Sequence, residues 1–269
     1  MGTTLLILAL LTLLIDSVGW KRFIWFISIG YGYSIAAIAI SLVIMHFSAI
    51  TWTTAVLCGL MAFYGCRLAT YLLIRELKST NYKQTVDLDA KNNSDYPKGV
   101  LFAIWISCVI LYLCQMFPLI VRIQNAADGL IDTQITAYIG IAVTAFGIWM
   151  EMWADKQKND AKKVNPKRFV DTGLYKIVRC PNYFGEILVW TGLFISGIGC
   201  YHTWWHWVLA LLGYIGIIYI MFSGARRLEL RQDINYGADP EYQAYKKRIP
   251  ILIPFLPIYS VSKYKWLKG

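Results

Sequence analysis

The chain has 269 residues, of which 57% are hydrophobic, and its mean hydropathy is +0.48. Soluble domains contain roughly 45–50% apolar residues, so this composition excludes an ordinary soluble protein. The formal net charge is +10. A basic balance can indicate nucleic-acid binding, but no recognised nucleic-acid-binding motif accompanies the charge, and we expect no nucleic-acid partner.

Apolar runs in the chain approach or exceed the length of about 20 residues that crosses a bilayer. Seven candidate spans cover residues 3–20, 23–46, 52–74, 99–121, 132–154, 183–200 and 204–223. The sixth span is short and contains three glycines, so it could be tilted or cross incompletely. The sequence therefore predicts an all-α, polytopic membrane protein with about seven transmembrane helices. We interpret residues 1–269 as one membrane domain, with a three-helix part at 1–98 and a four-helix part at 99–269.

The distribution of basic residues tests this count of spans, because loops rich in Lys and Arg stay in the cytosol. If the N-terminus is outside, the cytosolic segments hold 24 of the 26 Lys and Arg residues. Arg122 alone lies in an outside loop, and Arg67 lies within the third span. The pattern predicts a multi-pass protein of a bacterial inner membrane or the endoplasmic reticulum, with an outside N-terminus and a cytosolic C-terminus.

The cysteines and histidines do not form a metal-ligand pattern. No Cys-x-x-Cys pair occurs among the six cysteines. Most of them fall inside spans, where cysteine behaves as a small hydrophobe. The three histidines lie near the outer ends of spans, without metal-ligand spacing to a carboxylate. We expect neither a metal site nor a disulfide.

Ionisable side chains within or at the end of spans are candidate site residues, because an ionisable group inside a membrane is costly and usually functional. Arg67 shares a helix face with Tyr64 and Tyr71, although an arginine that snorkels to the interface would have the same position. Glu151 and Asp155 lie one turn apart at the end of the fifth span. Glu151 is the deeper carboxyl group, and it would pair with an arginine, bind a ligand hydroxyl or amine, or be protonated.

A polar segment at residues 171–186, which we call the elbow, joins the fifth span to the sixth and is dense in Gly, Pro, Asn and charge. Gly173 permits a tight turn because glycine tolerates a positive φ, and Asn182 is placed to cap the helix that follows. Free amides at a helix N-terminus, with Arg168 and Arg179 nearby, suit a phosphate group. An ordinary basic loop between two helices would have the same composition.

The tail at residues 249–259 is apolar but contains three prolines. Each proline removes a backbone donor and clashes with the preceding turn, so the tail cannot form a regular helix. Its apolar content is too high for a free cytosolic segment. We expect an extended strip that lies along the membrane surface beside the cofactor site.

Three motifs in the second half of the chain resemble a known family. They are Ala-Asp-Lys-Gln-Lys at residues 154–158, Gly-Leu-Tyr-Lys-Ile-Val-Arg-Cys-Pro-Asn-Tyr-Phe-Gly-Glu at residues 173–186, and the arginine-rich segment at residues 226–255. The segment from Trp149 onward resembles the C-terminal domain of the steroid 5α-reductase superfamily, and in particular its largely uncharacterised membrane-protein branch. This resemblance implies a polytopic enzyme that binds NADPH from the cytosol and reduces an activated C=C bond of a lipid.

The resemblance also implies roles for individual residues. Asp155 and Arg168 would contact the adenosine part of NADPH, and Asn182 would contact the nicotinamide region. Glu186 would orient this nicotinamide end. Further contacts to phosphates or ribose are implied for Tyr175, Arg226 and Arg248, with Tyr242 or Tyr245 assisting. Arg179 joins this cofactor-binding set through its charge and position in the elbow.

The N-terminal half departs from the family pattern. Steroid-reducing members have a Gln-Glu pair and a Tyr there, thought to polarise the enone carbonyl of the substrate, and this chain has no convincing counterpart of the pair. Tyr64 and Arg67 are the available substitutes, so we take Tyr64, Arg67 and Glu151 as the catalytic candidates. Residues 1–98 would form the substrate side for a steroid-like or other lipid. A monomer is compatible with the sequence.

Two alternative functions remain open. An isoprenylcysteine-type carboxyl methyltransferase, which uses S-adenosylmethionine, shares the elbow and the arginine-rich tail, but it usually has His-Pro where this chain has Cys180 and Pro181. A non-enzymatic lipid-binding membrane protein is the second alternative. Asn182 with Glu186, and the Ala-Asp-Lys-Gln-Lys run before the elbow, favour the reductase over the methyltransferase. Asn182, Glu186 and the tail arginines argue against the non-enzymatic protein.

Overall fold

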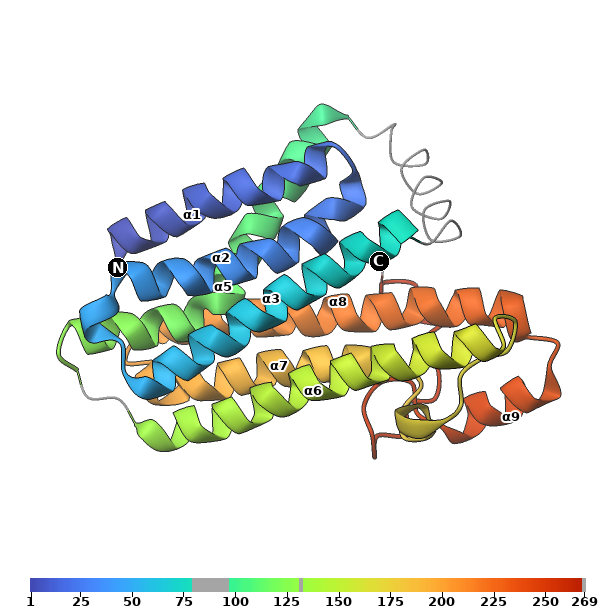
Figure 1. The fold of residues 1–269 in the computed structure, drawn as a ribbon. Coiled ribbons are helices and arrows are strands. Elements are labelled where there is room, and N and C mark those ends of the chain that lie inside the picture. The colour runs from blue at the N-terminus through green and yellow to red at the C-terminus, as the bar shows by residue number, and fades with distance from the viewer. Residues whose placement is uncertain (79–96, 131–132, 268–269) are drawn as a thin grey trace. The chain divides into compact units, whose positions relative to one another are not determined.

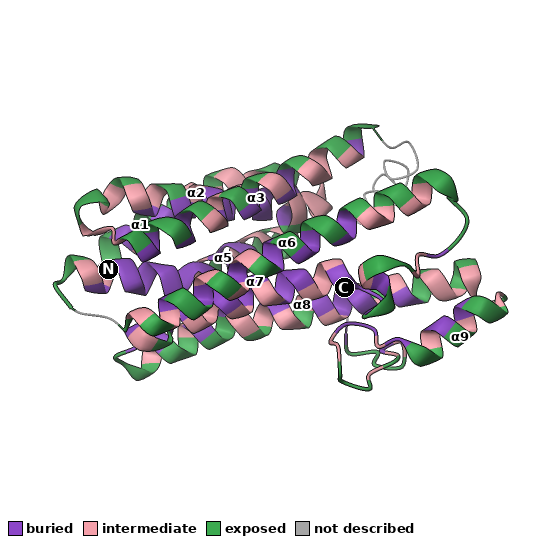
Figure 2. Cartoon of the chain, turned by 60° about the horizontal axis from the view of Figure 1, so that its bottom comes forward, coloured by how far each residue is buried: buried purple, intermediate pink, exposed green. Residues whose placement is uncertain are grey.

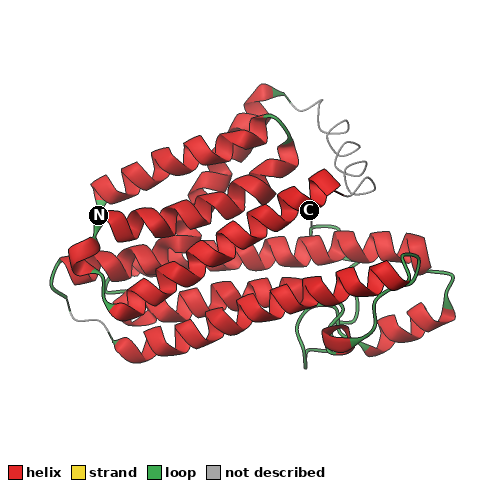
Figure 3. Cartoon of the chain, in the orientation of Figure 1, coloured by secondary structure: helices red, strands yellow, loops and turns green. Residues whose placement is uncertain are grey.

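The computed structural model describes residues 1–78, 97–130 and 133–267, and every regular element in these ranges is a helix (Figure 3). Most of the segment between the third and fourth predicted spans lies outside the described residues, as do Lys83, Lys91 and Lys268, which are among the basic residues assigned to the cytosol. The longer helices are α1 (Gly2–Asp16), α2 (Tyr31–Met45), α3 (Trp52–Lys78), α5 (Lys98–Ala127), α6 (Gln134–Val164), α7 (Pro181–Gly197), α8 (Trp204–Tyr236) and α9 (Pro240–Arg248) (Figure 1).

Seven helical segments of the described residues are long and apolar enough to cross a membrane, which confirms the predicted number of spans. Four of the helices, α3, α5, α6 and α8, continue beyond their predicted spans. The longest extensions are those of α6, from residue 154 to Val164, and of α8, from residue 223 to Tyr236. The charged residues that follow the apolar windows are good helix formers, and Lys156 pairs with Asp160 one turn later at 2.9 Å. Seven basic residues that follow these two spans therefore lie on helix extensions rather than in loops: Lys156, Lys158, Lys162, Lys163, Arg226, Arg227 and Arg231.

Two predictions about local structure are wrong. Arg122 does not lie in an outside loop, because α5 continues to Ala127 and the arginine is buried within it. Asn182 does not cap α7, because the helix begins at Pro181 and Asn182 is already inside its first turn. Proline is favoured at a first helical position, where its missing N–H would have had no helical partner.

Packing divides the chain into two compact units, described separately below. The first unit consists of Met1–Ile141 and Leu193–Tyr214, and the second consists of Ala142–Gly192 and Ile215–Gly269. These boundaries differ from the predicted boundary between the three-helix part and the four-helix part, which lies between residues 98 and 99. That division between a substrate side and a cofactor side stays a prediction about function.

In the first unit, α2 and α3 approach each other closely through a pair of glycines. A Cβ atom added at Gly32 would lie 2.7 Å from the carbonyl oxygen of Gly65 and 2.9 Å from the Cβ of Ala69. Ala36 has the matching position on α2, so each helix presents Gly-x-x-x-Ala. Small residues at this spacing let transmembrane helices approach closely, since lipid provides no hydrophobic driving force for association. Helix α5 adds many buried residues to this unit (Figure 2).

The second unit contains a similar contact between α6 and α7. A Cβ atom at Gly147 would lie 2.7 Å from the carbonyl oxygen of Gly185, and one at Gly185 would lie 2.7 Å from the backbone nitrogen of Glu151. Thr144 supports the contact by donating to the Val189 carbonyl at 3.3 Å. The glycine of the Asn-Tyr-Phe-Gly-Glu sequence is therefore a helix-packing residue.

The tail that follows α9 contains no regular helix in its described residues, which confirms the prediction from its prolines. Ile251 and Leu252 are buried inside the second unit, whereas Phe255 is 99% exposed. The N–H of Ile251 donates a hydrogen bond of 2.9 Å to the carbonyl of Ile258, and this bond closes the loop that contains Phe255. The expected contact of this tail with the membrane surface stays a prediction.

Candidate functional site

All ten residues predicted to bind the cofactor belong to the second unit, and it also contains Glu151. The ten are Asp155, Arg168, Tyr175, Arg179, Asn182, Glu186, Arg226, Tyr242, Tyr245 and Arg248. The other two catalytic candidates, Tyr64 and Arg67, belong to the first unit. The residues of the second unit are connected through the elbow, α9 and the tail.

The elbow is attached to α6 through Gln157. The side-chain oxygen of Gln157 accepts a hydrogen bond of 2.9 Å from the backbone N–H of Leu174. Gly173 has a φ of +61°, and a Cβ atom there would collide with the Gln157 side chain. The buried hydroxyl of Tyr175 donates to the Ala154 carbonyl at 3.3 Å. These contacts explain why Ala-Asp-Lys-Gln and Gly-Leu-Tyr occur together in one chain.

Helix α9 is attached to Phe169, two residues before the elbow, by a buried hydrophobic cluster that also contains Tyr242, Tyr245 and Ile249. The ring of Tyr245 stacks on Phe169 with centroids 5.3 Å apart, and its hydroxyl donates to the Tyr175 carbonyl at 2.7 Å. The Tyr242 hydroxyl donates to Asp233 on α8 at 3.0 Å. Burial raises the pKa of both phenols, which therefore stay neutral at physiological pH. In this structure the two tyrosines hold α9 and α8 to the elbow.

Arg179 forms a buried ion pair at the centre of the second unit. Its Nη2 donates to Glu229 at 3.0 Å, and both side chains are almost fully buried. The same nitrogen also donates to the Tyr259 carbonyl in the tail. The other oxygen of Glu229 accepts from the backbone N–H groups of Val261 and Ser262 at 2.8 and 3.0 Å. We call this arrangement the tail clasp.

The backbone next to Arg179 strengthens the tail clasp. The N–H groups of Arg179 and Cys180 donate to the carbonyls of Pro250 and Ile251, both at 2.9 Å. Arg226 donates to the carbonyls of Ser262 and Leu267 at 3.2 and 3.3 Å. Burial raises the pKa of the Cys180 thiol to about 12, so it is uncharged at neutral pH. The elbow and the tail thus form one continuous hydrogen-bonded surface.

The remaining cofactor candidates differ in burial. Arg168 is exposed and pairs with Glu241 on α9 at 2.6 Å and with Asp171 at 3.0 Å, and these two partners raise the pKa of its guanidinium. Arg248 is exposed at the end of α9, and Asn182 is half-buried. Asp155 is buried on α6.

Two buried carboxyl groups lie at the glycine contact between α6 and α7. Glu151 is 3% exposed, and its backbone packs against Gly185, while Glu186 is 8% exposed and follows that glycine directly. Buried carboxyl groups cost free energy unless they are paired or hydrogen-bonded, so their positions at one helix contact suggest a specific role.

The second unit suits a ligand with phosphate groups. Its sequence has seventeen Lys and Arg residues against nine Asp and Glu. Within the described residues, Nε and Nη1 of Arg179 are buried and make no hydrogen bond. Guanidinium groups are the donors that phosphate oxygens prefer, and the unit also has exposed arginines, Arg168 and Arg248. The residues therefore fit the phosphate part of NADPH.

In the first unit, Tyr64 belongs to a buried group of tyrosines. The hydroxyls of Tyr64 and Tyr31 are hydrogen-bonded at 3.2 Å, and the ring of Tyr31 lies 5.1 Å from that of Tyr112. The Tyr112 hydroxyl donates to the Phe26 carbonyl at 2.6 Å. Phe26 begins a π-helical turn, a feature that often accompanies functional sites. Arg67, one turn further along α3, is half-buried.

Sequence reasoning missed Asp16, which is fully buried at the end of α1. Its carboxyl group lies against Gly30, at the end of the same π-helical turn, where a Cβ atom would collide with it. Neither carboxyl oxygen makes a hydrogen bond to the described residues. The signal was present in the sequence, since Asp16 is the one acidic residue in the first apolar run.

The fold and these features define a polytopic, all-helical membrane protein with a basic, phosphate-compatible second unit. Residues 17–249 match the family model described as "Protein of unknown function (DUF1295)". The chain belongs to this family of steroid 5-alpha-reductase-like proteins.

A curated relative gives a partial match. Over 71 residues, which are 26% of the chain, it is 34% identical to "Steroid 5-alpha-reductase DET2" of Gossypium hirsutum. The matched segment spans 25% of that relative's length. No solved structure matches the chain.

Proposed function

We propose that the protein is a membrane-embedded, NADPH-dependent reductase of an activated C=C bond in a steroid-like or other lipid. Membership of a steroid 5-alpha-reductase-like family supports the reaction class. The observation that carries the proposal is the second unit, in which every predicted cofactor residue belongs to one compact and strongly basic structure.

Within the second unit, we assign the predicted residues to two tasks. Arg248 and Asn182 are accessible enough to contact a ligand, whereas Arg179 is buried and would act by holding the tail through the tail clasp. Tyr175, Tyr242 and Tyr245 are buried and would act by holding the elbow, α8 and α9 in position. Arg226 would fix the tail through its two backbone contacts.

The bound cofactor would supply hydride to the β-carbon of a conjugated alkene. Reduction of such a bond places negative charge on the oxygen of the conjugated carbonyl, and a preorganised donor stabilises that charge. Tyr64 is the strongest candidate donor of the first unit, because its hydroxyl is buried and hydrogen-bonded to Tyr31. Arg67 would stabilise the same charge, and the Tyr64 hydroxyl would hold the proton that completes the reduction.

The proposal is tested by titrating the purified full chain in lipid nanodiscs with NADPH, NADH and S-adenosylmethionine while following thermal unfolding. We expect saturable stabilisation by NADPH. Arg248→Ala should weaken NADPH binding by about 1.5–3 kcal/mol, because a charge-assisted phosphate contact is lost. That loss is a roughly 10- to 150-fold higher Kd.

A matched pair on α8 provides the control. Arg226→Ala should weaken NADPH binding, whereas Arg227→Ala, at an exposed neighbour with no assigned cofactor role, should leave it unchanged. Stabilisation by S-adenosylmethionine alone would overturn the reductase in favour of the methyltransferase. Equal NADPH affinity in the Arg226, Arg227 and Arg248 variants would refute the assignment of the arginines.

A further inference from the structure

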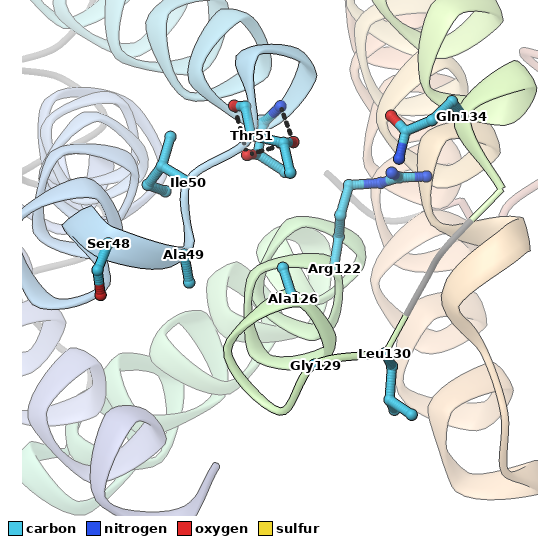
Figure 4. A pocket seen from close by; sticks show the side chains of 10 residues that line it. Ser48, Ala49, Ile50, Thr51, Arg122, Ala126, Gly129, Leu130 and Gln134 are labelled. Atoms are coloured by element: carbon cyan, nitrogen blue, oxygen red, sulfur yellow. Dashed lines mark hydrogen bonds between the residues drawn. The ribbon is translucent and has the colours of Figure 1, made fainter.

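A cavity of about 390 Å³ opens in the first unit, at the end of α5, the start of α6 and the connection between α2 and α3 (Figure 4). One part of its wall is polar and consists of Thr51, Thr54, Arg122 and Gln134. The other part is apolar and includes Ile50, Ala126 and Leu130. None of the predicted cofactor residues belongs to the unit that contains this cavity.

Arg122 places a buried positive charge in the wall of the cavity. It is 2% exposed, and its guanidinium donates to the Ser196 carbonyl at 2.7 and 3.1 Å and to the Thr133 carbonyl at 3.1 Å. A weaker contact of 3.4 Å reaches the Thr136 hydroxyl. These acceptors are all neutral, and no carboxylate of the described residues pairs with Arg122. A buried cation that lacks a counter-charge is costly, so an anion bound beside it would be stabilised.

The start of α3 adds the Thr51 hydroxyl and a favourable dipole to the same wall. Thr51 precedes the helix, and its hydroxyl accepts from the backbone N–H of Thr54 at 3.3 Å. The N-terminus of a helix carries partial positive charge and favours anions. Gln134 is held at the cavity because its side-chain oxygen accepts from the Thr53 hydroxyl at 3.0 Å. Figure 4 shows the Arg122 side chain extending from α5 toward Gln134.

We propose that this cavity binds a phosphate group, with the guanidinium of Arg122 as its counter-charge and the Thr51 hydroxyl as a further contact. Guanidinium and hydroxyl groups are the usual protein partners of phosphate oxygens. The apolar wall of Ile50 and Leu130 fits the first carbon atoms of an attached chain, so a lipid phosphate head group satisfies both parts of the lining. The site is independent of the proposed NADPH site, and either can fail without the other.

The experiment uses three probes on the purified full chain in nanodiscs of neutral lipid: hexyl phosphate, inorganic phosphate and hexyl glucoside. Thermal unfolding is followed as each probe is added. We expect saturable stabilisation by hexyl phosphate and none by hexyl glucoside. Stabilisation by inorganic phosphate at the same affinity would identify a free phosphate as the ligand, and much weaker stabilisation would identify a lipid head group. Absence of saturable stabilisation by both phosphates overturns the proposal.

A nearly isosteric substitution identifies the site. Gln134→Glu keeps the oxygen that accepts from Thr53 but places a negative charge beside Arg122, so it should raise the Kd for hexyl phosphate at least tenfold. The same substitution at Gln124, which does not line the cavity, is the control and should leave the Kd unchanged. Equal Kd values for wild type and Gln134→Glu would overturn the assignment to this cavity.

A second matched pair keeps the test decisive if Gln134→Glu does not fold. Ala126→Leu fills the cavity from α5, whereas Ala127→Leu adds the same side chain at the next, exposed position. Only Ala126→Leu should weaken binding of hexyl phosphate, again at least tenfold. A folded Ala126→Leu protein that binds hexyl phosphate as wild type does would also overturn the proposal.

Discussion

The two units use the same device to bring helices together, but they surround it with different chemistry. In the first unit the glycine contact of α2 and α3 lies beside Tyr31 and Tyr64, whose neutral hydroxyls are hydrogen-bonded to each other. In the second unit the glycine contact of α6 and α7 lies beside two buried carboxyl groups, Glu151 and Glu186. Close backbone packing thus supports neutral hydrogen bonds in one unit and ionisable groups in the other.

The two units also differ in charge, and the second unit has the larger number of ionisable residues. By sequence the first unit has nine Lys and Arg residues and seven Asp and Glu, whereas the second has seventeen and nine. The second unit also contains a buried ion pair and a non-helical tail held by backbone hydrogen bonds. We infer that packing stabilises the first unit, and that paired charges and the tail clasp stabilise the second. Three perturbations test this difference.

Removal of the tail should have the largest effect. A chain that stops after Lys247 lacks the Tyr259 carbonyl and the two N–H groups that bind Glu229. Arg179 then keeps Glu229 but loses its carbonyl partner, and Glu229 loses two of its hydrogen bonds, which is costly for groups built to be buried. We expect NADPH binding to be abolished while all seven spans still insert, measured by thermal shift with NADPH and by protease accessibility in membranes.

A shorter truncation is the control for the removal of the tail. A chain that stops after Lys265 keeps every contact of the tail clasp between Arg179, Glu229 and residues 259–262. It should bind NADPH with little loss. Normal NADPH binding by the chain that stops after Lys247 would show that the tail only anchors the protein to the membrane.

Neutralising one partner of the buried ion pair should have the next largest effect. Glu229→Gln leaves the buried Arg179 cation uncompensated, and such changes typically cost about 3–5 kcal/mol. Cys180 reports the result, because it is 2% exposed and burial raises its pKa to about 12. In a Cys66→Ser background, a maleimide at pH 7 should leave Cys180 unlabelled in the parent protein and label it in the Glu229→Gln variant.

Glu241→Gln is the matched control for this substitution. Glu241 pairs with Arg168 on the exposed surface, where an ion pair is screened by water and contributes little. Its loss should therefore leave Cys180 protected. Equal protection of Cys180 in the Glu229→Gln and Glu241→Gln variants would show that the tail clasp does not hold the second unit closed.

Adding a methyl group at either glycine contact should have the smallest effect on stability and the most selective effect on function. Gly65→Ala and Gly185→Ala each force two helices apart, at a cost of about 1–3 kcal/mol. We expect Gly185→Ala to weaken NADPH binding, and Gly65→Ala to lower turnover while NADPH binding is kept. Stability is measured by thermal unfolding and binding by titration.

Gly59→Ala provides the control on α3. A Cβ atom at Gly59 would meet no neighbour within 4 Å, so alanine there should be neutral or slightly stabilising in a helix. If Gly65→Ala and Gly185→Ala reduce NADPH binding equally, the two units do not divide the chemistry in the way that their side chains suggest.

The spans were predictable because a membrane requires long apolar helices, and each of the seven has a clear apolar run. The helix extensions of α6 and α8 were missed because the end of an apolar window marks the membrane boundary and not the end of the helix. The predicted cap at Asn182 failed for a local reason, since Pro181 already satisfies the geometry of a first helical residue.

Site residues could be predicted only where a local sequence pattern or a family resemblance pointed to them. The pairing of Arg179 with Glu229, fifty positions apart, has no local signal and depends on how α8 packs against the elbow. The inward-facing hydroxyls of Tyr242 and Tyr245 also depend on packing. Asp16 could have been found, because an acidic residue in an apolar run is rare enough to be informative.

The tail clasp has a consequence for how the protein is made. Arg179 and Tyr259 are 80 residues apart in the chain. At a synthesis rate of about 5–20 residues per second, Arg179 leaves the peptidyl-transferase centre roughly 4–16 s before its tail partner exists. During that interval the Arg179 guanidinium can pair only with Glu229, once α8 has packed, and it lacks the Tyr259 carbonyl of the tail. Completion of the second unit is therefore a late event of biosynthesis, because the tail clasp cannot close before the tail has been made.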